Sequence, residues 1–211
     1  MKVEDIPVYI CVRDRVSDLR GMVAWLQDAG QRNIILLDND STYPPLLEYF
    51  QETTAQIVLL GQNYGHHALF LAGINPEPPF YYTDPDLEFL GPHNGLRHLC
   101  VLAERFPDRD KIGFGLTLEG VPRHMPQWDW ETSLQSPARE IELGVLDSPL
   151  DTTFAIYNRP TISVNNALRT GEPNVMRHSS WYTYPQTLSE EDRYYLGHCE
   201  DPCSTWMSSQ R

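Results

Sequence analysis

The stretch FYYTDPDLEF, residues 80 to 89, combines an aromatic run with two acids one residue apart. Aromatic residues are enriched in strands, and Pro85 fixes the backbone between the acids, so we expect a buried strand to end at Thr83. Asp84 and Asp86 would then lie in the turn beyond it. Two carboxylates at the mouth of a sheet suit Mg²⁺ or Mn²⁺ bridging a diphosphate. Taken alone, however, an Asp-x-Asp is more typical of an acidic surface turn.

Upstream of this stretch, apolar runs alternate with helical patterns. The runs at 6–12, 33–39 and 56–60 are nearly continuous, as expected of strands buried on both faces of a parallel sheet. Apolar residues at helical spacing follow at 18–30 and 41–50. This repeat predicts an α/β fold in one domain, with helices on both faces of a mainly parallel central sheet.

The downstream half is less regular. Residues 93–106 have helical spacing, 111–118 and 152–158 have strand character, and a short helix is expected near Ser189. Prolines interrupt 121–150, where two tryptophans could be core residues or platforms for a sugar ring.

Four polar clusters stand where the expected strands end. They occupy residues 13–15, 38–41, 63–67 and 84–86. Ligands of open α/β sheets bind at the carboxyl ends of the strands. Each cluster alone could be a solvated loop, but four at one edge favour a shared cleft.

Composition narrows the range of functions. A chain of 211 residues fits one domain, and a formal net charge of -13 argues against nucleic acid as a general partner. Only Lys2 and Lys111 are lysines, and arginine suits bidentate contacts with phosphate. No signal peptide and no membrane span are expected, so a cytoplasmic location is predicted.

The four cysteines are expected to be reduced thiols. Cys11 and Cys100 lie in apolar segments and are predicted to be core residues. Cys199 and Cys203 stand near His198, but the local sequence supplies no further ligands for a zinc site.

With Asp38, Asp84, Asp86 and the order of strands assembled, the chain resembles the GT-A glycosyltransferases, most nearly the family 2 type, from Ile6 to about Tyr195. The resemblance implies a metal-dependent hexosyltransferase. Its donor would be a nucleotide sugar, with UDP-sugar favoured, and its acceptor a hydroxyl of a carbohydrate or other molecule. Residues 6–90 would form the nucleotide-sugar-binding half, 91–195 the acceptor and catalytic half, and 196–211 a tail.

The resemblance also implies roles for the strand-end residues. Asp38 would recognise the base, Arg13 would lie near the phosphates, and the segment NYGHHA, 63–68, would line the ribose and diphosphate. The expected donor-binding residues are Arg13, Asp38, Asn39, Asn63, Gly65 and Asp84.

A second motif lies far downstream. VMRHSS, 175–180, resembles an element of the β-1,4-galactosyltransferases whose histidine ligates the metal. The implied ligands of Mn²⁺ or Mg²⁺ are therefore Asp84, Asp86 and His178. A ligand in a flexible C-terminal segment could close the site when the donor binds. A solvated histidine beside Arg177 is the alternative.

The catalytic base departs from the family pattern, because no Glu-Asp pair stands between Asp86 and His178. Candidate carboxylates are Glu119, Glu131, Asp147 and Asp151. Asp151 is favoured, since its place in the chain is similar to that in the galactosyltransferases, and Glu131 follows. Asp151 could equally be a helix cap or turn residue.

Three other functions remain open at this point. ILLDNDST also fits the signature of haloacid-dehalogenase-type phosphatases through Asp38, Asp40 and Thr42. A nucleotidyltransferase would share the sheet and the metal. A non-catalytic module that binds sugar nucleotides would need no base.

Overall fold

The computed structural model describes residues 2–123 and 125–198, so Cys199 and Cys203 lie outside the described residues. Strands and helices alternate through the first half of the chain, as the sequence predicts. The elements are β1 (Val8–Val12), α1 (Ser17–Asp28), β2 (Ile34–Asp38), α2 (Pro44–Glu52), β3 (Gln56–Leu59), α3 (Ala68–Leu71), β4 (Phe80–Thr83), β5 (Leu87–Phe89), α4 (Gly95–Arg105), β6 (Lys111–Leu116), α5 (Pro126–Gln135), β7 (Arg139–Glu142), β8 (Val145–Asp147), β9 (Ala155–Tyr157), β10 (Ala167–His178) and α6 (Glu190–His198).

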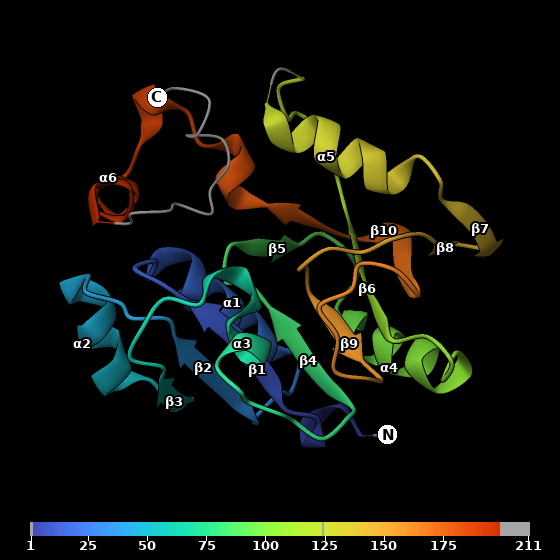
Figure 1. The fold of residues 1–211 in the computed structure, drawn as a ribbon, viewed down its shortest axis with the longest axis horizontal. Coiled ribbons are helices and arrows are strands. Elements are labelled where there is room, and N and C mark those ends of the chain that lie inside the picture. Colours follow the sequence, from blue (N-terminus) through green and yellow to red (C-terminus); the bar gives the residue numbers. More distant parts are fainter. Residues whose placement is uncertain (1, 124, 199–211) are drawn as a thin grey trace.

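One sheet contains the ten strands of the described residues, in the order β3-β2-β1-β4-β9-β6-β10-β8-β7, with β5 paired to β10 (Figure 1). The strands β3, β2, β1 and β4 pair in parallel. β9 is antiparallel to both β4 and β6, so β6 has the direction of β4, and the beginning of β10 pairs in parallel with β6. The predicted α/β class with a mainly parallel sheet is confirmed.

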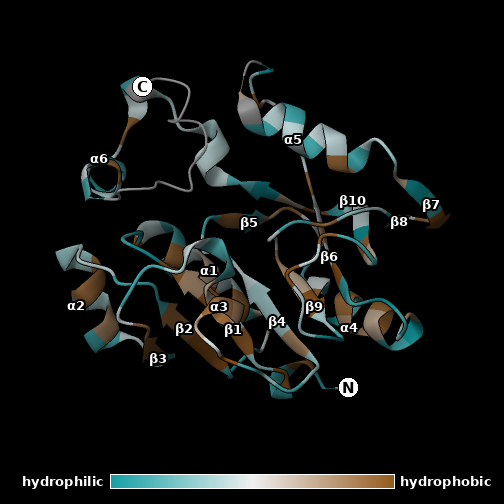
Figure 2. Ribbon diagram, in the orientation of Figure 1, coloured by the Kyte–Doolittle hydropathy of each residue, from teal (hydrophilic) through white to brown (hydrophobic). Residues whose placement is uncertain are grey.

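Side chains of the central strands alternate between two apolar layers. In β1, Val8, Ile10 and Val12 pack in the layer that contains the apolar faces of α1, α2 and α4. Cys11 lies in the opposite layer, with residues of α3. Successive residues of a strand point to opposite faces, so a sheet with helices on both sides needs a continuous apolar run (Figure 2). The predicted core thiols Cys11 and Cys100 are both buried, and neither forms a disulfide within the described residues.

The second half differs from the sequence expectation in three places. The expected strand at 152–158 is only Ala155–Tyr157, and 121–150 contains α5, β7 and β8. The long strand β10 was not expected, because its register shifts between Thr170 and Val175, and a glycine and a proline fall in that interval. Such an interruption hides the period of two on which a strand prediction depends.

β10 changes partners along its length. Its last three residues pair antiparallel with β5. His178 lies opposite Leu87, the residue that follows Asp86 in the sequence. His178 was expected in a flexible segment; the structure places it at the end of a strand, in register with the Asp-x-Asp turn.

The helix α6 lies at the upper left in Figure 1, above α2, and α5 lies farther to the right along the same edge. The carboxylate of Glu191 accepts hydrogen bonds from the backbone N–H groups of Val16 and Ser17, at 2.7 and 3.0 Å. The residue before α1 provides no side-chain cap, so a side chain from α6 satisfies the first turn of α1. None of the described helices is both long and apolar enough to cross a membrane.

We expect Glu191→Ala to lower the free energy of unfolding by about 1–2 kcal/mol, because it leaves two N–H groups of α1 without their acceptor. Urea denaturation followed by circular dichroism measures this. The control is Glu190→Ala, because Glu190 is exposed, and its effect should stay within about 0.5 kcal/mol. Equal effects of the two changes would show that the cap is dispensable.

Candidate functional site

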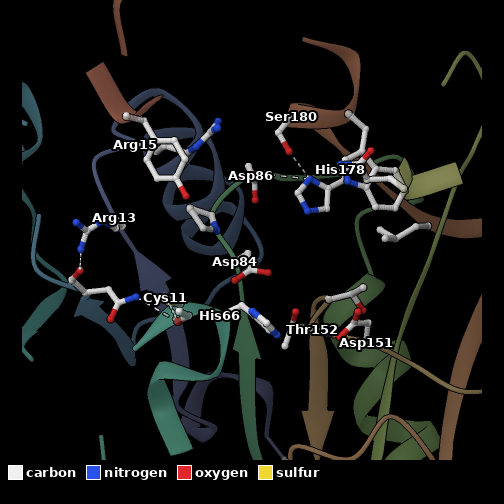
Figure 3. A pocket seen from close by; sticks show the side chains of 18 of the residues that line it. Cys11, Arg13, Arg15, His66, Asp84, Asp86, Asp151, Thr152, His178 and Ser180 are labelled. Carbon is white, nitrogen blue, oxygen red and sulfur yellow. Dashed lines mark hydrogen bonds and ion pairs between the residues drawn. The ribbon is translucent and has the colours of Figure 1, made fainter. Parts of the chain in front are cut away.

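A cavity of about 260 Å³ opens at the carboxyl ends of β1, β2 and β4 (Figure 3). Of the ten residues predicted for the site, all but Asp38 line it. These nine are Arg13, Asn39, Asn63, Gly65, Asp84, Asp86, Glu131, Asp151 and His178. The clusters at the strand ends therefore share one cleft.

The loop after β1 is fixed by a buried aspartate. Asp14, fully buried with φ 50°, accepts hydrogen bonds from the backbone N–H groups of Thr42 and Tyr43 at 2.6 and 2.8 Å. Arg13 donates to the carbonyl oxygen of Asn39 at 2.6 Å. The loops after β1 and β2 therefore form one unit, which places Arg13 at the cavity.

Asn39 connects this unit to the loop after β3. Its Nδ2 donates to Asn63 Oδ1 at 2.7 Å and to the Gly65 carbonyl at 3.1 Å. Its Oδ1 accepts the N–H of Tyr64 at 2.7 Å. Both ends of the amide are used within the protein, so Asn39 holds the wall of the cavity together.

Asp38 lies outside the cavity lining. It is 6% exposed, and its carboxylate accepts the backbone N–H of Ser41 at 3.1 Å. Burial raises the pKa of Asp38, with hydrogen bonds from Ser41 acting in the opposite direction. The carboxylate therefore supports the turn after β2, and contact with a nucleotide base remains a prediction.

Asp86 and His178 are close together as a result of the β5–β10 pairing. His178 Nδ1 lies 3.4 Å from Asp86 Oδ2 and 2.9 Å from Ser180 Oγ, and Trp181 stacks on the imidazole at an interplanar angle of 8°. Burial alone would raise the pKa of Asp86, but His178, Arg15 and a hydrogen bond from Ser180 together lower it.

Burial also lowers the pKa of His178, although Asp86 opposes this. A neutral imidazole is the form that binds metals.

The pKa of Asp84 shifts in the opposite direction from that of Asp86. Burial, followed by the negative charges of Asp86 and Asp151, raises the pKa of Asp84 well above its usual range. In Figure 3, Asp84 lies between Asp86 and His66, facing the same space as His178. Burial and the neighbouring carboxylates therefore disfavour the ionised form of Asp84.

The predicted metal ligands suit a divalent cation in their chemistry. Carboxylate oxygen and imidazole nitrogen suit Mn²⁺, and a cation would relieve the repulsion at Asp84. In residues 2–123 and 125–198, however, no group of three or more His, Cys, Asp or Glu side chains is arranged to hold a metal ion. The ligand set Asp84, Asp86 and His178 remains a prediction.

Asp151 lies on the other side of the cavity, beside Thr152 (Figure 3). Its Oδ1 accepts the N–H of Thr152 at 2.8 Å, and its Oδ2 accepts the indole N–H of Trp130 at 2.8 Å. Both oxygens have one donor each, which leaves each with lone-pair capacity for another. Asp151 can therefore accept a further hydrogen bond from a ligand in the cavity.

Glu131 has a different environment from Asp151. Its Oε1 lies 2.5 Å from Arg169 Nη1, and both side chains are 2% exposed. Gln135 donates to the same oxygen at 2.8 Å. Glu131 therefore serves the packing of α5 against β10, although it also reaches the cavity lining.

Several residues of the cavity lining were not predicted as site residues from the sequence. Arg15, His66, Ser180, Trp181 and Tyr195 all line the cavity. Arg15 and His66 lie within polar clusters recognised at strand ends, so their position was available from the sequence. Trp181 and Tyr195 follow β10 in the chain, and the path of the backbone after β10 brings them to the cavity. No sequence pattern predicts that path.

Comparisons with known proteins identify no family. No family model matches the sequence, and no curated protein matches it. Solved structures of glucosyl-3-phosphoglycerate synthase from Mycobacterium tuberculosis are similar in outline. One, with Mn²⁺, UDP and glucosyl-3-phosphoglycerate, has 15% identity and a TM-score of 0.45, over 74% of this chain and 60% of that one. Another, with Mn²⁺, UDP and phosphoglyceric acid, has 14% identity and a TM-score of 0.45, over 74% of this chain and 58% of that one.

The chain thus spans about 60% of the length of the synthase it matches. The function proposed below rests on the residues of this chain.

We expect Asp84→Asn to raise the melting temperature at pH 7.5 in EDTA, and Asp86→Asn to lower it. An acid whose folded pKa is raised destabilises the fold above that pKa, and this penalty vanishes below the unfolded pKa. An acid whose folded pKa is lowered stabilises the fold above its unfolded pKa, and this is lost as pH falls.

Thermal denaturation from pH 7.5 to pH 4 measures both effects, and each kcal/mol corresponds to about 2–4 °C in a chain of this size. Both differences from the unsubstituted protein should shrink toward pH 4. A shift of the same sign in both variants would contradict the charge distribution described above.

Proposed function

We propose that the chain is a GT-A-type glycosyltransferase that transfers a hexose from a nucleotide sugar, with UDP-sugar as the favoured donor, to an acceptor hydroxyl. The observation that carries the proposal is the single cavity with Asp84, Asp86 and His178 at one side and Asp151 at another. Such a pairing of a cation-binding group with a separate carboxylate suits displacement of a diphosphate by a hydroxyl.

In this proposal Asp84, Asp86 and His178 hold Mn²⁺ or Mg²⁺. The bound cation would neutralise charge on the departing nucleoside diphosphate. The chain prepares the ligands: stacking on Trp181 fixes the imidazole plane, and Arg15 favours the ionised form of Asp86. Arg13 is assigned to the phosphates, since it lines the same cavity.

We assign the base to Asp151, which would take the proton of the acceptor hydroxyl. The new bond joins that oxygen to the anomeric carbon, and the bond from this carbon to the phosphate oxygen breaks. Glu131, the second candidate, is held by Arg169 in a buried ion pair. We therefore give Glu131 a structural role.

UDP is expected to raise the melting temperature only when Mn²⁺ or Mg²⁺ is present, because the diphosphate would bind through the cation. At a hundredfold excess of UDP over its Kd the gain is about 2.7 kcal/mol. Differential scanning fluorimetry with UDP, the metal and both together measures it.

Asp86→Asn should abolish this shift, whereas Glu88→Gln, a change at an exposed residue of β5, should retain it. A shift with UDP alone, equal to that with metal, would reject the metal-diphosphate assignment.

Asp151→Asn is expected to lower transfer about 10²–10⁴-fold while UDP binding persists, because only the proton acceptor is removed. Release of UDP or GDP from a panel of nucleotide sugars, with mixed acceptors, measures turnover. Glu119→Gln is the control, since Glu119 is exposed and lies outside the cavity lining. Full turnover in Asp151→Asn would refute the assigned base.

Three further assays separate the other functions. A phosphatase would hydrolyse a generic phosphate ester and lose this in Asp38→Asn, but the Asp38 carboxylate supports its own turn. A nucleotidyltransferase would release pyrophosphate from a nucleoside triphosphate. A binding module would bind the donor and release no nucleotide with any acceptor.

A further inference from the structure

We propose that Trp130 is the acceptor platform of the cavity, that the acceptor is a pyranose, and that the indole both stacks on the sugar ring and orients Asp151. This inference rests on the proposed function and adds to it the class of the acceptor. It also gives a role to the most exposed tryptophan of the described part of the chain, which is 52% exposed.

The indole of Trp130 lies at the rim of the cavity. Trp130 lies on α5 and lines the cavity, unlike Trp128 on the same helix, which packs against the apolar core. Ser133 Oγ donates to the Trp130 carbonyl at 2.6 Å, within the helix. The exposed aromatic face lies at the rim of a polar cavity, so it is available to stack on a ligand there.

The indole and the carboxylate form one unit. Trp130 Nε1 donates to Asp151 Oδ2 at 2.8 Å, so the carboxylate lies at the edge of the indole ring. A six-membered sugar ring lying flat on the indole carries its hydroxyls at its own rim. One of these hydroxyls would therefore meet Asp151, which retains acceptor capacity.

A buried arginine holds the two parts of this unit together. Arg169, 1% exposed, is paired with Glu131, the neighbour of Trp130 on α5. Its Nη2 donates to the carbonyl of Pro149 at 2.6 Å, two residues before Asp151. One guanidinium in β10 thus fixes both the helix that carries the indole and the loop that carries the carboxylate. Arg169 and Glu131 are positioning residues in this arrangement.

The chemistry of the unit selects a pyranose over a linear or a charged acceptor. A pyranose offers one apolar C–H face to the indole and several hydroxyls to the cavity, which matches an amphipathic aromatic beside a carboxylate. A carboxylate-bearing acceptor stacked on the indole would place its charge beside the Asp151 carboxylate at the edge of the ring. A rigid sugar ring can stack on the Trp130 indole and at the same time direct one of its hydroxyls at Asp151, which a linear acceptor does not do.

The experiment separates the two roles of the indole with two variants. Trp130→Phe keeps an aromatic face and removes the N–H donor, whereas Trp130→Leu removes both. Trp128→Phe is the control on the same helix. The donor is UDP-glucose, or whichever nucleotide sugar the panel identifies. The acceptor probes are methyl pyranosides, with glycerol as a hydroxyl probe that has no ring.

For the pyranosides, Trp130→Leu should raise the acceptor KM about tenfold or more, since the stacking face is lost. Trp130→Phe should keep that KM within about threefold and lower kcat about tenfold, because a hydrogen bond to the charged carboxylate is lost. Trp128→Phe should leave both unchanged, and the KM of glycerol should not respond to any variant. Unchanged pyranoside kinetics in both Trp130 variants, with an active unsubstituted enzyme, would overturn the inference.

A binding measurement keeps the platform testable if no transfer is detected. Titration of methyl pyranosides should change the tryptophan fluorescence of the unsubstituted protein and of Trp128→Phe, but not of Trp130→Leu. This result with no nucleotide release would reject the proposed transferase and sustain the sugar platform. Release of UDP without any fluorescence response to pyranosides would reject the platform and sustain the transferase.

Discussion

The antiparallel pairing of β10 with β5 sets the geometry of the whole site. It places His178 opposite Leu87 and so brings the imidazole within 3.4 Å of Asp86, a residue far away in the sequence. The same strand pairs in parallel with β6 earlier in its course, which joins it to the central sheet. Backbone hydrogen bonds, which must be satisfied in the interior, therefore determine which side chains meet at the cavity.

The charges around the cavity are balanced unequally. Asp86 has a histidine, an arginine and a serine as partners that lower its pKa, whereas burial and the negative charges of Asp86 and Asp151 raise the pKa of Asp84. Sites that bind a charged ligand are commonly destabilised before the ligand arrives, because the binding groups repel one another. The two carboxylates of the Asp-x-Asp turn thus repel each other within the fold, and a bound cation would relieve this repulsion.

Two sets of hydrogen bonds support the side chains that line the cavity. On one side, Asp14 and Asn39 tie three loops together with hydrogen bonds between 2.6 and 3.1 Å. On another, Arg169 links α5 with the loop before Asp151. Groups that are held by such contacts keep a fixed geometry without help from the ligand, which is the condition for effective electrostatic catalysis.

The sequence by itself determined the α/β class and the meeting of the polar clusters after β1, β2, β3 and β4 at one cavity. It could do so because buried parallel strands require continuous apolar runs, and polar residues that follow such strands collect at the same edge. Only the tertiary structure decided the partners: that Glu131 is paired with Arg169, that Asp38 supports its own turn, and that His178 ends a strand. The irregular register of β10 carries no periodic signal, and contacts between residues distant in the chain depend on the path of the backbone. Sequence patterns report which face of an element is apolar, but packing selects which side chains touch.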